Sequence, residues 1–240
     1  PTPSYIYSKQ KIIENFKNLE FAFKGVDHLI CFAVKANSNI AILNLLAKNG
    51  AGFDIVSGGE LKRVLAADGD PAKIVFSGVG KTKEEIKLAI ENNILTFNVE
   101  SEGELDRIQE IANAMNKKAS ISIRVNPNVD AKTHPYISTG LKENKFGVSE
   151  ESAFDLYKKA HSLDAIEIKG IDCHIGSQIT DLKPFEDSLK KLNKLVDKLE
   201  AEGINITHLD IGGGIGISYD NEKTIDLNKY AEIISKGING

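Results

Sequence analysis

The 240-residue chain has few of the features that signal a cross-linked, metal-bound or membrane-embedded protein. Its two cysteines, Cys31 and Cys173, exclude a disulfide framework and a cysteine-rich zinc site. We expect both to be packing residues of a cytoplasmic protein. No apolar run approaches the roughly 18 residues of a membrane span, and residues 1–7 lack a signal-peptide pattern. A net charge of -4 argues against a nucleic-acid partner.

The chain does contain a regular alternation of short apolar runs and longer amphipathic segments. The runs are rich in Ile, Val and Phe and predict seven strands, at residues 28–36, 52–57, 73–79, 95–99, 119–126, 168–176 and 208–212. Alternating strands and helices predict an α/β fold with parallel strands. Seven such units in series indicate a (β/α)8 TIM-type barrel with one unit missing. We expect the barrel over residues 28–240, preceded by a strand segment and a helix over 1–27.

Two local patterns refine this prediction. Three helices are expected to begin with reciprocal capping boxes, formed by the pairs Ser57 and Glu60, Thr82 and Glu85, and Ser101 and Glu104. The connection over residues 126–147 is long and has no periodicity of its own, which is typical of a functional loop.

In a barrel of this kind the catalytic residues lie at the carboxyl ends of the strands. The chemistry-bearing residues at those ends are Lys35, Asp54, Ser77, Asn98, Arg124, His174, Ser177, Gly212, Gly213 and Gly214. This set defines the candidate site.

Lys35 follows an unbroken apolar strand, where a barrel directs its strand ends toward the site. A desolvated lysine amine has a lowered pKa and forms Schiff bases, whereas most lysines are solvated surface groups. Arg124 lies within a strand, so its guanidinium requires an anionic or phenolate partner nearby. Asp54 is a candidate ion-pair partner of either Lys35 or Arg124.

The remaining strand ends suit a phosphorylated planar ligand. The run Gly212, Gly213 and Gly214 allows backbone amides to approach an anion, although a plain turn is the alternative. Ser177 is a donor for a phosphate. His174 is a general acid–base or a ring-stacking group, or a satisfied core histidine. Together with a Schiff-base lysine, these groups are what pyridoxal phosphate requires.

The ordered motifs FAVKAN, FDIVSGGEL, RVNPN…THPYISTG…KFG, HIGSQ and LDIGGG resemble the barrel domain of the fold-type III pyridoxal phosphate decarboxylases, and the diaminopimelate decarboxylases in particular. The resemblance implies that Lys35 carries the cofactor with Asp54 beside it, and that Arg124 lies near the phenolic oxygen. It further implies that His174 stacks on the ring, that Ser177 and residues 212–214 hold the phosphate, and that His134 and Tyr136 lie in a substrate loop at the mouth.

The same resemblance implies an activity and a partner. The reaction is the decarboxylation of meso-diaminopimelate, a small amino acid, to L-lysine and carbon dioxide, performed by a homodimer without a metal. The family's E-x-G-R stretch on the eighth strand is absent before Gly240, as is its β-rich second domain with the substrate-binding residues. We therefore expect the chain to be the inactive first part of a longer enzyme, whose residues 3–7 add a strand to that second domain.

Other interpretations remain open at this point. A related arginine or carboxynorspermidine decarboxylase and an alanine-racemase-like enzyme share the barrel and the cofactor. A non-catalytic barrel fragment or a small-molecule binding module is the alternative outside the enzymes.

Overall fold

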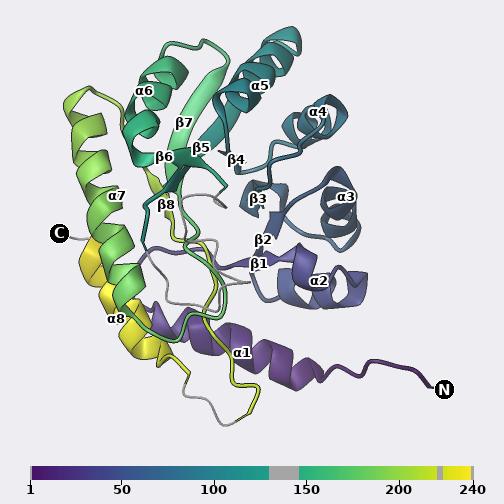
Figure 1. Ribbon diagram of the computed structural model, residues 1–240. Helices are drawn as coiled ribbons and strands as arrows, with labels where there is room; N and C mark the ends of the chain where they lie inside the picture. Colours follow the sequence, from purple (N-terminus) through teal and green to yellow (C-terminus); the bar gives the residue numbers. More distant parts are fainter. Residues whose placement is uncertain (1, 130–145, 221–223, 239–240) are drawn as a thin grey trace.

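The computed structural model describes residues 2–129, 146–220 and 224–238 (Figure 1). A parallel sheet lies at the centre and helices cover its outer side. Its strands are β1 (Cys31–Ala33), β2 (Gly52–Ile55), β3 (Ile74–Phe76), β4 (Thr96–Val99), β5 (Ala119–Asn126), β7 (Ile166–Asp172) and β8 (His208–Asp210), with a short β6 (Val148–Ser149) beside β5.

The strands pair in chain order as β1-β2-β3-β4-β5-β7-β8, and every pair is parallel. Ala33 is paired with Asp54 at one side of the sheet, and Asp172 with Asp210 at the other. In the described ranges no bridge joins β1 to β8, so the barrel is open there. The predicted TIM-type barrel lacking a unit is confirmed.

Eight helices occur in the described ranges, and most begin at a polar cap. They are α1 (Lys9–Ala22), α2 (Ile40–Ala47), α3 (Gly58–Ala66), α4 (Lys83–Glu91), α5 (Glu102–Ala114), α6 (Glu150–His161), α7 (Lys183–Ala201) and α8 (Leu227–Ile238). The side chains of the N-cap residues of α1, α2 and α6 each accept a hydrogen bond from a backbone amide of their helix. These residues are Ser8, Asn39 and Ser149. Among the described helices, none is long and apolar enough to cross a membrane.

Two of the three predicted capping boxes are wrong in detail. Only Thr82 and Glu85 bond reciprocally. Ser57 and Ser101 do cap α3 and α5. Their glutamates, however, accept from the residue before the cap, because Glu60 bonds the amide of Val56 and Glu104 bonds the amide of Glu100. These two side chains therefore anchor the carboxyl end of the preceding strand.

The strand boundaries also need correction. β1 is shorter than predicted, because a 3-10 turn over Val34–Ala36 follows it and the amide of Asn37 donates to the carbonyl of Val34 at 3.0 Å. Lys35 therefore lies on a turn and not in the strand. β6 was not predicted, since two residues are too short to show a period. In the sixth predicted strand, residues 173–176 lie beyond the end of β7.

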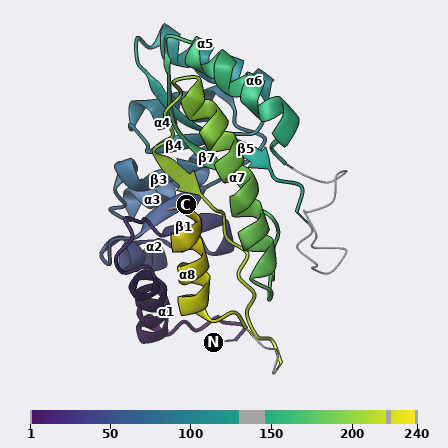
Figure 2. The same ribbon diagram turned by 90° about the vertical axis from the view of Figure 1, so that its left-hand side faces the viewer.

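Two apolar clusters stabilise the fold. The larger one fills the space between the sheet and α2 to α7, and includes Phe53, Phe97 and Tyr157. The smaller one joins α1, α7 and α8, where the rings of Phe185 and Tyr230 meet edge to face at 4.9 Å. Figures 1 and 2 show α1 and α8 near each other beside the open edge of the barrel. The smaller cluster thus ties the first described helix to the last.

Gly170 allows β7 to lie close to both of its neighbours. A Cβ there would collide with the carbonyl of His208 in β8 and would lie 2.8 Å from Oγ of Ser122 in β5. We expect Gly170→Ala to lower the free energy of unfolding by more than about 2 kcal/mol, measured by urea unfolding. Gly103→Ala is the matched control. Nothing lies within 4 Å of its Cβ position on α5, so unchanged or increased stability is expected. Equal effects of the two substitutions would contradict this account.

Candidate active site

The carboxyl ends of β1 to β4 bring four of the predicted residues into one hydrogen-bonded chain. Lys35 Nζ lies 3.2 Å from Oδ2 of Asp54. Ser77 Oγ donates to the other oxygen of Asp54 at 2.6 Å, and Asn98 Nδ2 donates to Ser77 Oγ at 3.2 Å. Because the strands are parallel, residues about twenty positions apart in sequence meet at this edge. Of the two partners considered for Asp54, the structure selects Lys35.

Lys35 is less buried than its sequence context suggests. Its side chain is 59% exposed, so the expected desolvation of the amine is not observed. The reason is local, since the 3-10 turn carries Lys35 past the end of β1 to the rim of the barrel. Asp54 rather than burial holds the ammonium group in place.

Arg124 is buried inside the barrel and has two carboxylate partners. Its Nη1 lies 3.0 Å from Glu100 Oε1, and its Nε lies 3.8 Å from Asp172 Oδ2. The three side chains are at most 12% exposed. The prediction of an anionic partner for Arg124 is confirmed, but the sequence did not show which residues supply it. Glu100 directly follows β4 and Asp172 ends β7, and a carboxylate at the end of a predicted strand is the signal that would have found them.

Asp210, at the end of β8, connects this network to the glycine run. Its Oδ1 accepts the amide of Gly212 at 2.8 Å, and its Oδ2 accepts from Asn98 Nδ2 at 3.3 Å. Burial raises the pKa of Asp210, and it raises the pKa of Asp172 well above its usual range. The two carboxylates also disfavour each other's charge, since they are register partners on adjacent strands.

The glycine run adopts a turn that is crowded on one side and open on the other. Gly212 and Gly214 have φ values of +69° and +91°. A side chain on Gly212 would meet the carbonyl of Cys173 at 2.5 Å, and one on Gly214 would collide with the carbonyl of Gly176. At Gly213, by contrast, no heavy atom lies within 4 Å of the Cβ position. The turn therefore packs against residues 173–177 and leaves open space beside its central residue.

His174 lies against this turn and is neutral at physiological pH. Burial lowers the pKa of His174 to about 4, and the charges of Arg124 and Lys35 act in the same direction. The amide of Gly213 donates to Nδ1 at 3.4 Å, so the proton of the neutral ring is assigned to Nε2. Ser177 lies on the same segment, with its Cα 3.3 Å from the Cβ position of Gly214.

The other predicted residues fall outside this arrangement. His134 and Tyr136 lie outside the described residues. Burial raises the pKa of both Cys31 and Cys173. Cys173 packs in the larger apolar cluster, as expected. Within the part of the chain that the structure describes, no group of three or more His, Cys, Asp or Glu is placed to hold a metal.

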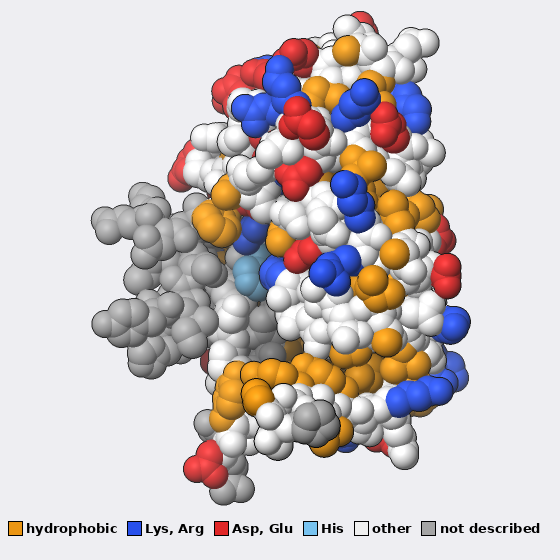
Figure 3. All heavy atoms as spheres, turned by 90° about the vertical axis from the view of Figure 1, so that its right-hand side faces the viewer, with side chains coloured by type: hydrophobic (Ala, Val, Ile, Leu, Met, Phe, Trp, Pro, Cys, Tyr) orange, Lys and Arg blue, Asp and Glu red, His pale blue; other side chains and the backbone are white. Residues whose placement is uncertain are grey.

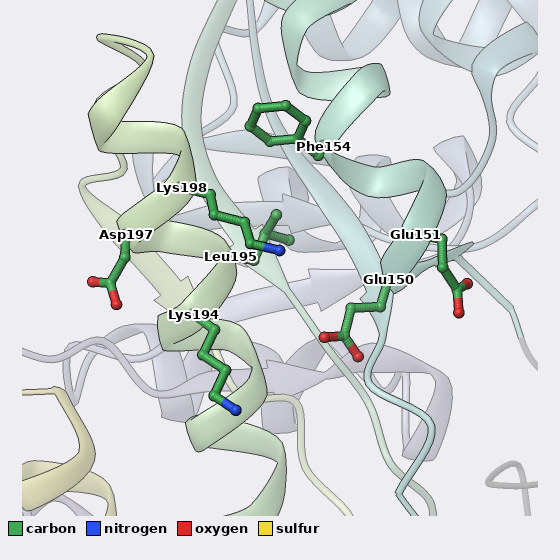
Figure 4. Close-up of a pocket in the computed structure, with 7 residues that line it drawn as sticks. All are labelled: Glu150, Glu151, Phe154, Lys194, Leu195, Asp197 and Lys198. Carbon is green, nitrogen blue, oxygen red and sulfur yellow. The ribbon is translucent and has the colours of Figure 1, made fainter.

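The surface views separate the strand ends from the outer helices. Figure 3 shows a histidine side chain in a hollow next to lysine or arginine side chains. A second hollow, of about 580 Å³, lies on the outside of the barrel between α6 and α7 (Figure 4). Phe154 and Leu195 contribute apolar surface there, and Asp197 points away from α6. None of the strand-end residues lines it.

With this geometry established, comparison with known proteins identifies the family. Residues 9–239 match the model of the family described as "Pyridoxal-dependent decarboxylase, pyridoxal binding domain". The chain belongs to this family. The lysine, the glycine turn and the neutral histidine at the strand ends therefore form part of a pyridoxal-binding barrel.

Individual relatives agree with this assignment. The chain is 54% identical over 239 residues to diaminopimelate decarboxylase of Pseudomonas aeruginosa, and spans 58% of that protein. It matches the structure of Helicobacter pylori diaminopimelate decarboxylase complexed with L-lysine at 51% identity and a TM-score of 0.97, covering 100% of this chain and 61% of that one. Lysine decarboxylase from Selenomonas ruminantium matches at 28% identity and a TM-score of 0.87, over 100% and 59%. The chain thus spans less than two thirds of each relative.

The burial of His174 has a measurable consequence for stability. Because the pKa is about 4 in the folded state and 6.5 ordinarily, the unfolded state binds the extra proton between these values. Stability contributed by the neutral ring is therefore complete above pH 6.5 and lost as the pH falls toward 4. We expect the free energy of unfolding to fall by about 3 kcal/mol over this range in the wild-type protein, and this fall should be missing in His174→Gln. Urea unfolding without cofactor at several pH values measures both. Parallel pH profiles of the two proteins would contradict the shift.

Proposed function

We propose that the protein carrying this chain decarboxylates meso-diaminopimelate to L-lysine and carbon dioxide with pyridoxal phosphate. The observation that carries the proposal is the placement of Lys35 beside Asp54, at the same barrel mouth as the glycine turn and the neutral ring of His174. The identity of 54% to a diaminopimelate decarboxylase supports the choice of reaction.

The residues at the mouth fit the cofactor in shape and chemistry. The space beside Gly213 suits a phosphate, because no side chain fills it and a glycine run lets the backbone approach an anion closely. Ser177, on the segment packed against that turn, adds a hydroxyl donor. Lys35 would hold the cofactor through Nζ, which Asp54 orients. When bound, pyridoxal phosphate supplies a conjugated ring that accepts the electron pair left by departing carbon dioxide.

Two further side chains would orient the ring. His174 presents a neutral imidazole, which stacks on a planar cationic ring without adding a like charge. Arg124 is fixed by Glu100 and Asp172, so its guanidinium is positioned without the ligand. A prearranged donor of this kind is suited to a phenolic oxygen. Both roles remain proposals.

The substrate contacts belong to the same proposal. The chain spans 58% of the Pseudomonas aeruginosa enzyme. We assign none of the described residues to contacts with the substrate. The homodimer, the cytoplasmic location and the pairing of residues 3–7 with a second domain stay predictions. Tyr5 and Ile6 are 92% and 95% exposed, so they are accessible to such a domain.

The test begins with the cofactor. The full-length protein should gain visible absorbance with pyridoxal phosphate, and borohydride reduction followed by peptide mass spectrometry should find the cofactor on Lys35. Lys35→Ala should abolish turnover. The matched control is Lys73→Ala, because Lys73 bonds the carbonyl of Gly50 away from the mouth and should keep wild-type absorbance and turnover. Cofactor found on another lysine, or none found, would refute the assignment.

The substrate is tested by release of carbon dioxide from meso-diaminopimelate, L-lysine and L-arginine in parallel. Turnover of meso-diaminopimelate with lysine as the product is expected. Preference for L-lysine would instead place the protein with the Selenomonas ruminantium enzyme, and preference for L-arginine would support the related decarboxylases. Cofactor binding without any turnover would favour a binding module.

A further inference from the structure

A buried ion pair, Lys81 with Glu104, lies behind the barrel mouth and contacts none of the residues proposed to hold the cofactor. Lys81 Nζ is 2.6 Å from Glu104 Oε1, and the two side chains are 0% and 6% exposed. The ammonium group also donates to the carbonyls of Gly78 at 2.7 Å and Asn98 at 2.9 Å. Its three donors are thus used by three different segments, namely the β3–α4 loop, β4 and the first turn of α5.

The need for a stable fold does not explain this pair. Desolvating two charges is costly, and a buried ion pair is often no more stabilising than apolar side chains of similar volume. Lys81 already lies 5.5 Å from the ring of Phe76, at the border of the apolar core. Apolar residues at positions 81 and 104 would therefore find packing partners. What they would lack is the set of directed bonds to the backbone.

Those bonds converge on Glu100. Glu104 Oε2 accepts the amide of Glu100 at 2.9 Å. Glu100 Oε1 in turn accepts the amide of Gly78 at 2.9 Å and a bond from Arg124 Nη1 at 3.0 Å. Lys81 thus bonds the carbonyl of Gly78 and Glu100 bonds its amide, and the φ of this glycine is +93°. This closed ring of contacts fixes the carboxylate that holds Arg124.

A second branch leads to the glycine turn. Lys81 fixes the carbonyl of Asn98, and the side chain of Asn98 donates to Ser77 Oγ and to Asp210 Oδ2. Asp210 then accepts the amide of Gly212. The first three of these hydrogen bonds lie between buried or half-buried groups and the last reaches the exposed amide of Gly212, so a shift of the Asn98 backbone would reach the turn.

We propose that Lys81 and Glu104 are positioning residues of the site, which set Arg124 through Glu100 and the glycine turn through Asn98. The inference rests on the proposed cofactor site but assigns a role to residues outside it. Neither side chain touches the ligand. Their effect is on how well the cofactor is held, not on whether the barrel folds.

The test replaces the pair with apolar residues in the full-length protein, as the double variant Lys81→Met and Glu104→Leu. The cofactor-free double variant should still unfold cooperatively, with a lower melting temperature because the carbonyls of Gly78 and Asn98 and the amide of Glu100 lose their partners. Its dissociation constant for pyridoxal phosphate, measured by absorbance titration, should rise by about ten-fold or more. The matched control is Lys83→Gln with Glu110→Gln, which removes an exposed ion pair at 3.4 Å between α4 and α5 and should change neither quantity.

A double-mutant cycle with Glu100→Gln separates positioning from general weakening. If the pair acts through Glu100, the two changes should raise the dissociation constant less than additively. Strict additivity, or a wild-type dissociation constant in the double variant, would overturn the proposal. Binding to wild-type protein is measured first, so a failure of the cofactor site itself is recognised separately.

A second variant keeps the proposal testable if the double variant does not fold. In Glu104→Gln the amide oxygen still accepts from Lys81, but the amide nitrogen replaces the acceptor for the Glu100 amide. The side-chain volume is unchanged. A rise of about ten-fold in the dissociation constant is expected here too, and an unchanged value would refute the role of Glu104.

Discussion

The buried guanidinium of Arg124 is the charge on which the arrangement of the mouth depends. An arginine stays protonated at any pH a protein survives, so the barrel must supply negative partners once this side chain lies inside it. Glu100 and Asp172, from the segments on either side of β5, provide them. Glu100 in turn requires its own donors and finds one in the amide of Gly78. One arginine within an apolar strand therefore accounts for much of the polar network around it.

Parallel pairing determines which side chains share this space. Ala33 is in register with Asp54, so a lysine two residues further on reaches that carboxylate directly. On the other side of the sheet, parallel register brings together the carboxylates of Asp172 and Asp210, and their contact is unfavourable because the two groups repel each other. Asp210 is compensated by two amide donors. Topology alone thus brings together both the favourable and the unfavourable pairs.

Features that depend on periodicity were predictable from the sequence, whereas contacts that depend on strand register were not. Residues 119–126 match β5 at both ends, because eight residues that alternate between apolar and polar side chains have an unambiguous period of two. The two residues of β6 have none. For Arg124 the need for an anion could be predicted from burial in a strand, but the choice of Glu100 depends on which strands are neighbours. The exposure of Lys35 depends on a 3-10 turn that no residue of the FAVKAN motif predicts.

Burial, more than the balance of charges at the mouth, explains why the imidazole of His174 is neutral. At the described strand ends, four carboxylates, those of Asp54, Glu100, Asp172 and Asp210, stand with the two cations Lys35 and Arg124. Among the described residues, Asn98 Oδ1 and Glu100 Oε2 are buried without a donor. Burial, and to a lesser extent the neighbouring carboxylate of Asp210, raise the pKa of Asp172. Burial, together with the charges of Arg124 and Lys35, lowers the pKa of His174 to about 4 and disfavours the charged ring. The imidazole at the glycine turn is therefore uncharged near pH 7, which suits it to stacking more than to proton transfer.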